Sequence, residues 1–183
     1  MGRFVVRVVA FFTLIACLTG QAQLKDEYWQ GVPTNQKTEF SVSGWGNRFM
    51  YIQCFISTLD NWRLFWGEKW DENRKTTEFI QTILEATFPE QSTLFVVVAN
   101  GSKSQYFWPT EFVFTQGSRQ YGISYSDVLP FSEDDPFAGG EMKPYIVTEG
   151  FIAIPKGIDV TKPFKIWYGD DFGALDPTAQ TSQ

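Results

Sequence analysis

The chain has 183 residues, a formal net charge of −6, 17% aromatic residues and no histidine. The absence of histidine excludes Ser-His-Asp and Cys-His catalysis and histidine-ligated zinc, and the acidic balance disfavours nucleic acid as a partner. With no phosphate-binding loop and no Ser-x-x-Lys motif either, we predict a protein that is not an enzyme and that uses no cofactor and no metal.

Residues 1–22 are typical of an export signal. Arg3 and Arg7 precede an apolar run of 11 residues from Val8 to Leu18. A run of that length is too short to cross a bilayer as a helix, which takes about 20 residues. A positively charged start followed by a short apolar run is instead the pattern of a signal peptide. We therefore expect the mature protein to work outside the cytoplasm.

Two cleavage sites compete at the end of this signal. Residues 20–22, Gly-Gln-Ala, fit an ordinary signal peptidase, which would release a soluble secreted or periplasmic protein beginning at Gln23. Residues 14–17, Leu-Ile-Ala-Cys, resemble the lipobox of bacterial lipoproteins, and that resemblance implies that Cys17 is lipidated. We favour the lipobox, with the polar residues 23–37 as a tether that holds the domain near the membrane of the cell envelope.

The first predicted strands span residues 39–43 and 48–58. The Gly-rich residues 44–47 between them suit a hairpin connection. Because Cys17 lies in the export segment, Cys54 is the one cysteine in the predicted folded domain and can form no internal disulfide. We expect Cys54 to be a free thiol that behaves as a small buried apolar side chain.

A tryptophan-rich segment follows, over residues 61–70. Trp62, Trp66 and Trp70 recur at every fourth position, as on one face of a helix, whereas Trp62, Leu64 and Trp66 alternate as in a strand. Exposed aromatic rings make stacking platforms for sugars, peptides or protein partners. The three tryptophans are therefore our candidate binding residues, and the alternative is that their rings fill one end of the core.

Residues 76–88 carry the same conflict between helical and strand spacing. Their threonine and isoleucine content favours a strand. The next segment, residues 93–99, is a valine-rich run typical of a core strand. We predict that the two segments pair as a hairpin through a turn at residues 89–92.

The valine-rich strand should be central to the core. Val96 and Val98 share one of its faces, and Phe95 and Val97 share the other. Short strands with no convincing long helix are typical of a sandwich or a barrel. Further strands, rich in aromatic and β-branched residues, are predicted at 106–115, 120–125, 145–154 and 164–168.

Residues 76–170 contain a series of short motifs in a characteristic order. They are the valine-rich strand closed by Asn100, the Trp-Pro-x-x-Phe-x-Phe run of residues 108–114, Gly117 to Tyr121, Gly139 to Pro144, Gly150 to Pro155, and residues 164–168. With these motifs the segment resembles an immunoglobulin-like domain of unknown function that is common in bacterial lipoproteins and secreted proteins. The resemblance implies an immunoglobulin-like antiparallel β-sandwich, all-β in class, to which no catalytic residues are attached. The sequence departs from the family where Tyr145 follows Pro144, because the family often has Pro-Gly there.

We accordingly predict one β-sandwich domain over residues 38–175, followed by a disordered polar tail, 176–183. Its expected function is that of a non-enzymatic, extracytoplasmic binding or accessory domain, tethered to the membrane through lipid, whose partner is an envelope protein or polymer. Two alternatives stay open. One is a carboxylate-dependent polysaccharide hydrolase, which needs two carboxyl groups in one groove. The other is a purely structural envelope protein.

Overall fold

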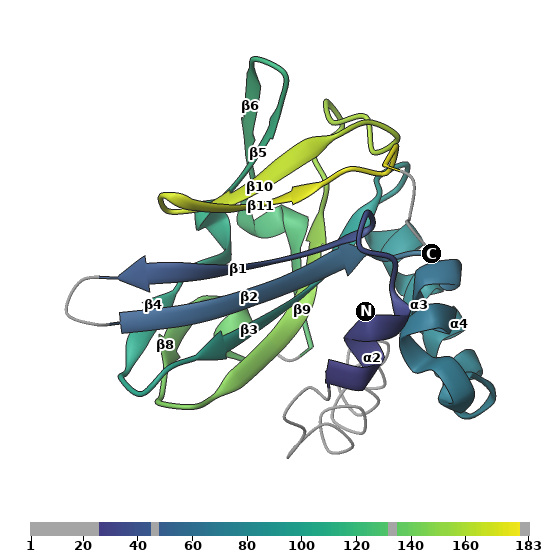
Figure 1. Cartoon of the computed structure of the whole chain (residues 1–183), viewed down its shortest axis with the longest axis horizontal. Helices are drawn as coiled ribbons and strands as arrows, with labels where there is room; N and C mark the ends of the chain where they lie inside the picture. The colour runs from purple at the N-terminus through teal and green to yellow at the C-terminus, as the bar shows by residue number, and fades with distance from the viewer. Residues whose placement is uncertain (1–25, 45–47, 132–134, 180–183) are drawn as a thin grey trace.

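The computed structural model describes residues 26–44, 48–131 and 135–179. Within them the chain forms two antiparallel sheets packed face to face, with a layer of helices on the outer side of the larger sheet (Figure 1). The predicted all-β, antiparallel sandwich is confirmed, and its sheets do not close into a barrel. The predicted signal and Cys17 lie outside the described residues.

The larger sheet has five strands, and the sheet opposite it has four. A separate two-stranded ribbon closes one end of the sandwich. The larger sheet runs β1 (Lys37–Gly44), β2 (Arg48–Ile56), β3 (Thr93–Asn100), β9 (Val147–Ala153), β7 (Val128–Pro130). The smaller sheet runs β11 (Asp171–Leu175), β10 (Phe164–Tyr168), β5 (Phe112–Gln116), β6 (Arg119–Gly122), and the ribbon pairs β4 (Gln105–Phe107) with β8 (Gly140–Met142). Short 3-10 helices lie between strands: η2 (Pro109–Glu111), η3 (Tyr125–Asp127) and η4 (Pro136–Ala138).

Strand β3 is buried on both faces, which is why its sequence shows no polar alternation. Val96 and Val98 point into the core between the two sheets. Phe95 and Val97 point the opposite way, into a second core beneath the helices. The predicted β1–β2 hairpin is confirmed, and Cys54 on β2 lies in the core between the sheets with its side chain fully buried.

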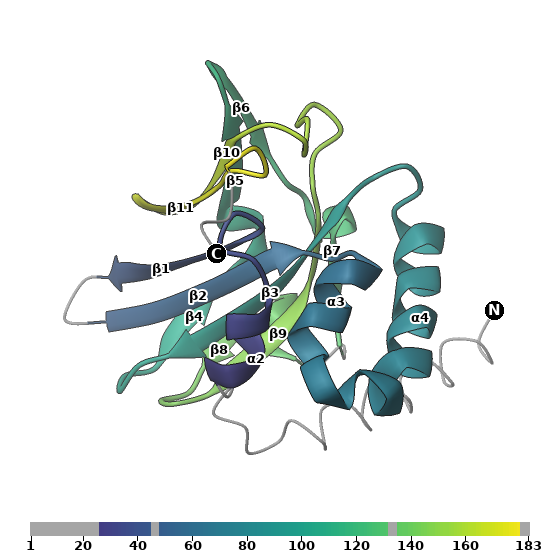
Figure 2. The same ribbon diagram turned by 45° about the vertical axis from the view of Figure 1, so that its right-hand side comes forward.

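The helical layer contains a correction to the sequence analysis. Residues 76–88, predicted as a strand, lie almost wholly in a helix, α4 (Trp70–Thr87), whose buried residues Thr77, Ile80 and Leu84 recur at helical spacing. The expectation of no long helix is therefore wrong. Figure 2 shows α4 beside α3 (Leu59–Trp66), to which it is joined by η1 (Gly67–Lys69).

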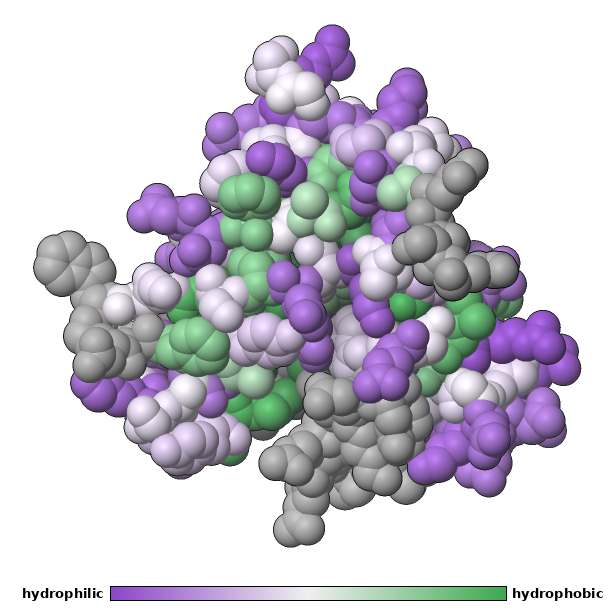
Figure 3. Space-filling view, in the orientation of Figure 1, coloured by the Kyte–Doolittle hydropathy of each residue, from purple (hydrophilic) through white to green (hydrophobic). Residues whose placement is uncertain are grey.

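The predicted hairpin between residues 76–88 and 93–99 is consequently wrong as well. Strand β3 pairs with β2 on one side and with β9 on the other. The segment with two competing periodicities becomes a helix because the outer face of the larger sheet offers an apolar surface, including Phe55 and Phe95, against which one helical stripe can pack. In Figure 3, hydrophilic side chains cover the α4 side, while hydrophobic ones gather over β2, β10 and β11.

The packed structure extends into both predicted terminal segments. Within the predicted tether, residues 26–31 form α2 (Asp26–Gly31), and Trp29 and Val32 are buried against the helical layer. At the other end, the Asn35 side-chain amide donates a hydrogen bond to the carbonyl of Ala179 over 3.0 Å. The described part of the tail is thus held against the segment that precedes β1.

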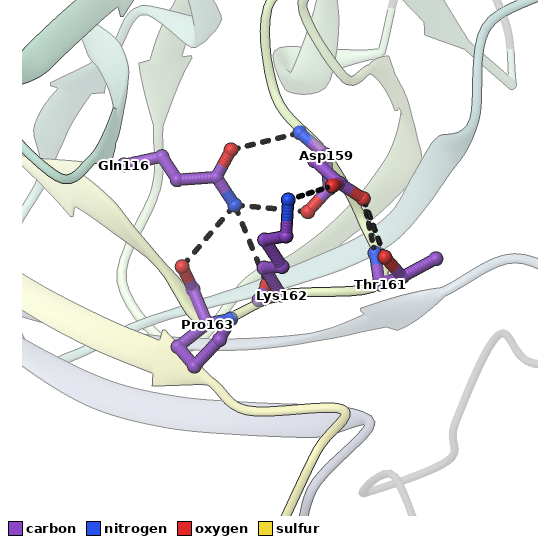
Figure 4. Close-up of polar contacts among 5 residues, drawn as sticks. All are labelled: Gln116, Asp159, Thr161, Lys162 and Pro163. Atoms are coloured by element: carbon purple, nitrogen blue, oxygen red, sulfur yellow. Dashed lines mark hydrogen bonds and ion pairs between the residues drawn. The ribbon is translucent and has the colours of Figure 1, made fainter.

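The loop between β9 and β10 is fastened to β5 by one side chain (Figure 4). The Gln116 amide nitrogen donates to the Asp159 carbonyl at 2.9 Å, and the Gln116 amide oxygen accepts from the Asp159 backbone N–H at 2.8 Å. Asp159 in turn accepts from Thr161 and pairs with Lys162 over 2.8 Å. Those hydrogen bonds, the one from Lys162 first, hold the pKa of Asp159 at about 2.

Candidate functional site

The three tryptophans singled out by the sequence do not form an exposed platform. Trp62 is only 4% exposed and packs in the second core, its ring centroid 4.8 Å from that of Phe95. Its indole N–H donates to the Ser57 hydroxyl over 2.9 Å. Trp66 and Trp70 are partly buried at the edge of the same core, and the Trp66 indole donates to Thr77 over 3.2 Å. Trp62 is a core residue, which is the alternative that the sequence left open.

A different set of aromatic side chains is exposed together, near the ribbon. Tyr106 is 60% exposed, Trp108 37% and Tyr125 56%. The rings of Tyr106 and Trp108 lie 5.9 Å apart between centroids, with their planes only 5° from parallel. We call Tyr106, Trp108 and Tyr125 the aromatic platform.

The local sequence explains why Tyr106 and Trp108 point outward. In β4, Gln105 and Phe107 are buried and Tyr106 is exposed, as strand alternation requires. Residues 106–115, predicted as one strand, are two strands in different sheets, because η2 begins at Pro109 directly after Trp108. The backbone N–H of Trp108 donates to the Tyr168 hydroxyl over 3.0 Å, which fixes the chain at this crossing.

Gly139 allows the third ring to join the other two. Its φ of +104° lies where residues with a side chain rarely go. A Cβ built on Gly139 would lie 2.9 Å from Trp108 Cε3 and 3.4 Å from the Tyr125 hydroxyl. The Trp108 ring therefore occupies the space that another residue at 139 would fill, and the Tyr125 hydroxyl lies at its border. Tyr125 itself begins η3, which is closed by a capping box between Ser124 and Asp127.

Polar groups border the platform. Glu141 on β8 is exposed and is the direct cross-strand partner of Tyr106, and the two tyrosines contribute their hydroxyls. The arrangement offers apolar ring surface together with hydrogen-bond donors and acceptors, which suits binding rather than bond cleavage. Part of it was visible in the sequence, because the alternation of Tyr106, Phe107 and Trp108 already predicts two aromatic residues on one face of a strand.

A pocket of about 520 Å³ lies elsewhere, between the start of α3 and α4. It is relevant to the hydrolase alternative because Asp60 and Glu85 both line it. Both residues are exposed, and none of the lining residues is aromatic. The Ser57 hydroxyl in its lining serves the packing of the helices, since it accepts hydrogen bonds from Gln81 and Trp62.

Across the described residues, no group of three or more Asp, Glu or Cys side chains could hold a metal ion. No helix in that part of the chain is long and apolar enough to cross a membrane. Comparison of the chain with protein-family models, with curated proteins and with solved structures found no match to any of them.

Proposed function

We propose that this protein is a non-enzymatic, extracytoplasmic binding domain that holds an envelope polysaccharide on the aromatic platform. The observation that carries the proposal is the exposed, nearly parallel pair of rings from Tyr106 and Trp108. Sugar rings present apolar C–H faces that stack on aromatic rings, and their hydroxyls pair with groups such as the Glu141 carboxylate at the border.

The size of the platform favours a glycan over a protein. A stable protein interface takes about 800 Å² from each partner, and the platform consists of three side chains. A few sugar units need no more surface than that. The hydrolase alternative has less support, because the pocket that holds Asp60 and Glu85 has no aromatic ring among its lining residues with which to position a sugar.

The location in the cell envelope rests on the sequence. The export signal and the lipobox at residues 14–17 support a lipid anchor on Cys17, with a soluble secreted or periplasmic protein as the alternative. The resemblance to an immunoglobulin-like lipoprotein domain stays a prediction, and it agrees with a role in binding.

Titration of the protein with soluble fragments of envelope polysaccharides tests the proposal. We expect Trp108→Ala and Tyr106→Ala each to weaken binding about fivefold or more, the scale of an aromatic hot spot. Phe79→Ala is the matched control, because Phe79 is an exposed ring on α4 and its loss should leave binding unchanged.

Two results would overturn the proposal. If no polysaccharide binds, the platform has another role and a purely structural function is favoured. If a glycan is hydrolysed and Asp60→Asn or Glu85→Gln abolishes that turnover, the protein is an enzyme.

A further inference from the structure

A second exposed apolar surface lies where β2 and β9 begin and β3 ends. Phe49, Tyr145, Ile146 and Val147 are all exposed there, Tyr145 at 75%. Phe49 and Tyr145 lie on either side of Gly101, which has no side chain to separate them. We call these four residues the tip surface. Its loops close the lower end of the sheet in Figure 1, opposite the β5–β6 hairpin.

Tyr145 occupies a backbone conformation that favours glycine. Its φ is +60°, and the N–H of Ile146 donates to the Lys143 carbonyl over 3.3 Å. Residues 143–146 therefore form a turn with Pro144 at its second position and the positive-φ residue Tyr145 at its third. A tyrosine there costs conformational free energy that glycine would not. Since its ring is mostly exposed, packing within the chain does little to offset that cost.

The turn is held rigidly although it is at the surface. The Asn100 side-chain amide donates to the carbonyls of Lys103, Met142 and Lys143, at 3.0, 2.9 and 2.8 Å. The backbone N–H of Tyr145 donates to the Gly101 carbonyl over 2.9 Å. The backbone that carries Tyr145 is therefore fixed, so little loop entropy is lost when this residue binds.

The charge around the tip surface is opposite to that of the protein. The chain carries −6 overall, yet the two loops beside Tyr145 contribute Lys103 and Lys143. Carboxylates also lie on the strands that border these loops. Glu141 lies on β8, opposite Tyr106, and Glu149 lies two positions beyond Val147 on β9. Glu39 on β1 accepts a hydrogen bond from the Tyr51 hydroxyl over 2.5 Å.

We propose that the tip surface docks into the interface of a membrane that contains anionic lipid. Tyrosine is enriched at membrane interfaces, where its amphipathic ring lies at the level of the lipid headgroups. Lysines beside it attract anionic headgroups. A tyrosine on a strained, hydrogen-bonded turn, flanked by apolar side chains and two lysines in an acidic protein, has the chemistry of such a surface. The inference does not depend on the aromatic platform or on lipidation of Cys17.

A fluorophore at the tip tests this docking directly. The full chain with Cys17→Ser and Tyr145→Cys is labelled with an environment-sensitive thiol dye and mixed with phosphatidylglycerol vesicles, which contain no sugar. Cys54 is fully buried and should not take up the dye. We expect a blue shift of the emission, which high salt reduces and which phosphatidylcholine vesicles do not produce. The matched control carries Ser118→Cys, an exposed site at the turn of the β5–β6 hairpin, and should show no shift.

A second variant separates docking from folding. Tyr145→Gly relieves the strained turn, so it should fold at least as well as the parent chain. With the dye placed at Ile146→Cys instead, we expect Tyr145→Gly to reduce the anionic-vesicle shift several-fold, and Lys143→Glu to do the same.

An unshifted dye at position 145, or an equal shift at position 118, would overturn the inference, as would full docking of the Tyr145→Gly chain. Dimers that form through the tip and block the dye in the absence of vesicles would point to a second copy as the occupant, and would overturn it too.

Discussion

Gly139 and Trp108 share one space: the indole ring lies where the side chain of any other residue at 139 would begin. Gly139→Ala should therefore displace Trp108, and it also places an alanine at a φ of +104°. We expect a loss of about 1–3 kcal/mol in unfolding free energy from the backbone, measured by urea denaturation, together with weaker glycan binding. Gly117→Ala is the control, since Gly117 also has positive φ but open space around it. It should lose stability and keep binding.

Trp62→Ala should destabilise the protein by about 3–5 kcal/mol, because it empties a buried site and removes one of the two hydrogen-bond donors to the Ser57 hydroxyl. Leu64→Ala, on the exposed side of α3, should change the unfolding free energy by no more than about 0.5 kcal/mol. If urea denaturation gives both variants the stability of the parent chain, the second core is not packed as described.

Asp at either face of β3 should prevent folding, because Val97 and Val98 are both buried and the new charge would have no partner. Circular dichroism and size-exclusion chromatography of Val97→Asp and Val98→Asp test this. Val147→Asp on β9, at an exposed position, should fold normally. A folded protein with Asp at both 97 and 98 would contradict the central place of β3.

Burial raises the pKa of the Cys54 thiol to about 12. The native protein therefore keeps its proton at a pH where the unfolded chain, with a cysteine pKa of about 8.5, has lost it. That contribution to stability is complete below about pH 8.5 and falls by about 1.4 kcal/mol per pH unit as the pH rises from there toward 12.

Denaturation at pH 8 and pH 10 measures this loss, with Cys54→Ala as the reference that lacks the thiol. The variant should be less stable than the parent chain by on the order of 1 kcal/mol at pH 8. At pH 10 the parent chain should have lost about 2 kcal/mol of the thiol's contribution, so the order should reverse and the variant should be the more stable protein. Thiol reagents should react slowly with native Cys54 and quickly after unfolding. Rapid labelling of the native protein would contradict its burial.

Lipidation of Cys17 predicts that acyl-label incorporation and membrane partitioning both disappear in Cys17→Ser expressed in a bacterial host. Cys54→Ala should retain both. Mass spectrometry of a mature protein that begins at Gln23 would show that the ordinary signal peptidase site is used instead.

The sequence by itself determined the sandwich class and most of its strands. The runs that became β2, β3, β9 and β10 are short, apolar and rich in β-branched or aromatic residues, so their periodicity and propensity agree. Cys54 could be predicted as buried for the same reason, because both faces of its strand are apolar.

Only the tertiary structure decided between helix and strand where the local sequence pattern fitted both. Residues 76–88 fit a strand and a helix alike, and the helix formed because the outer face of β2, β3 and β9 was available to cover one helical stripe. The same contact buried Trp62. The platform, too, depends on distant pairing. Tyr106, Trp108, Tyr125 and Gly139 come together only when β4 pairs with β8, and no spacing along the chain encodes a contact between segments so far apart.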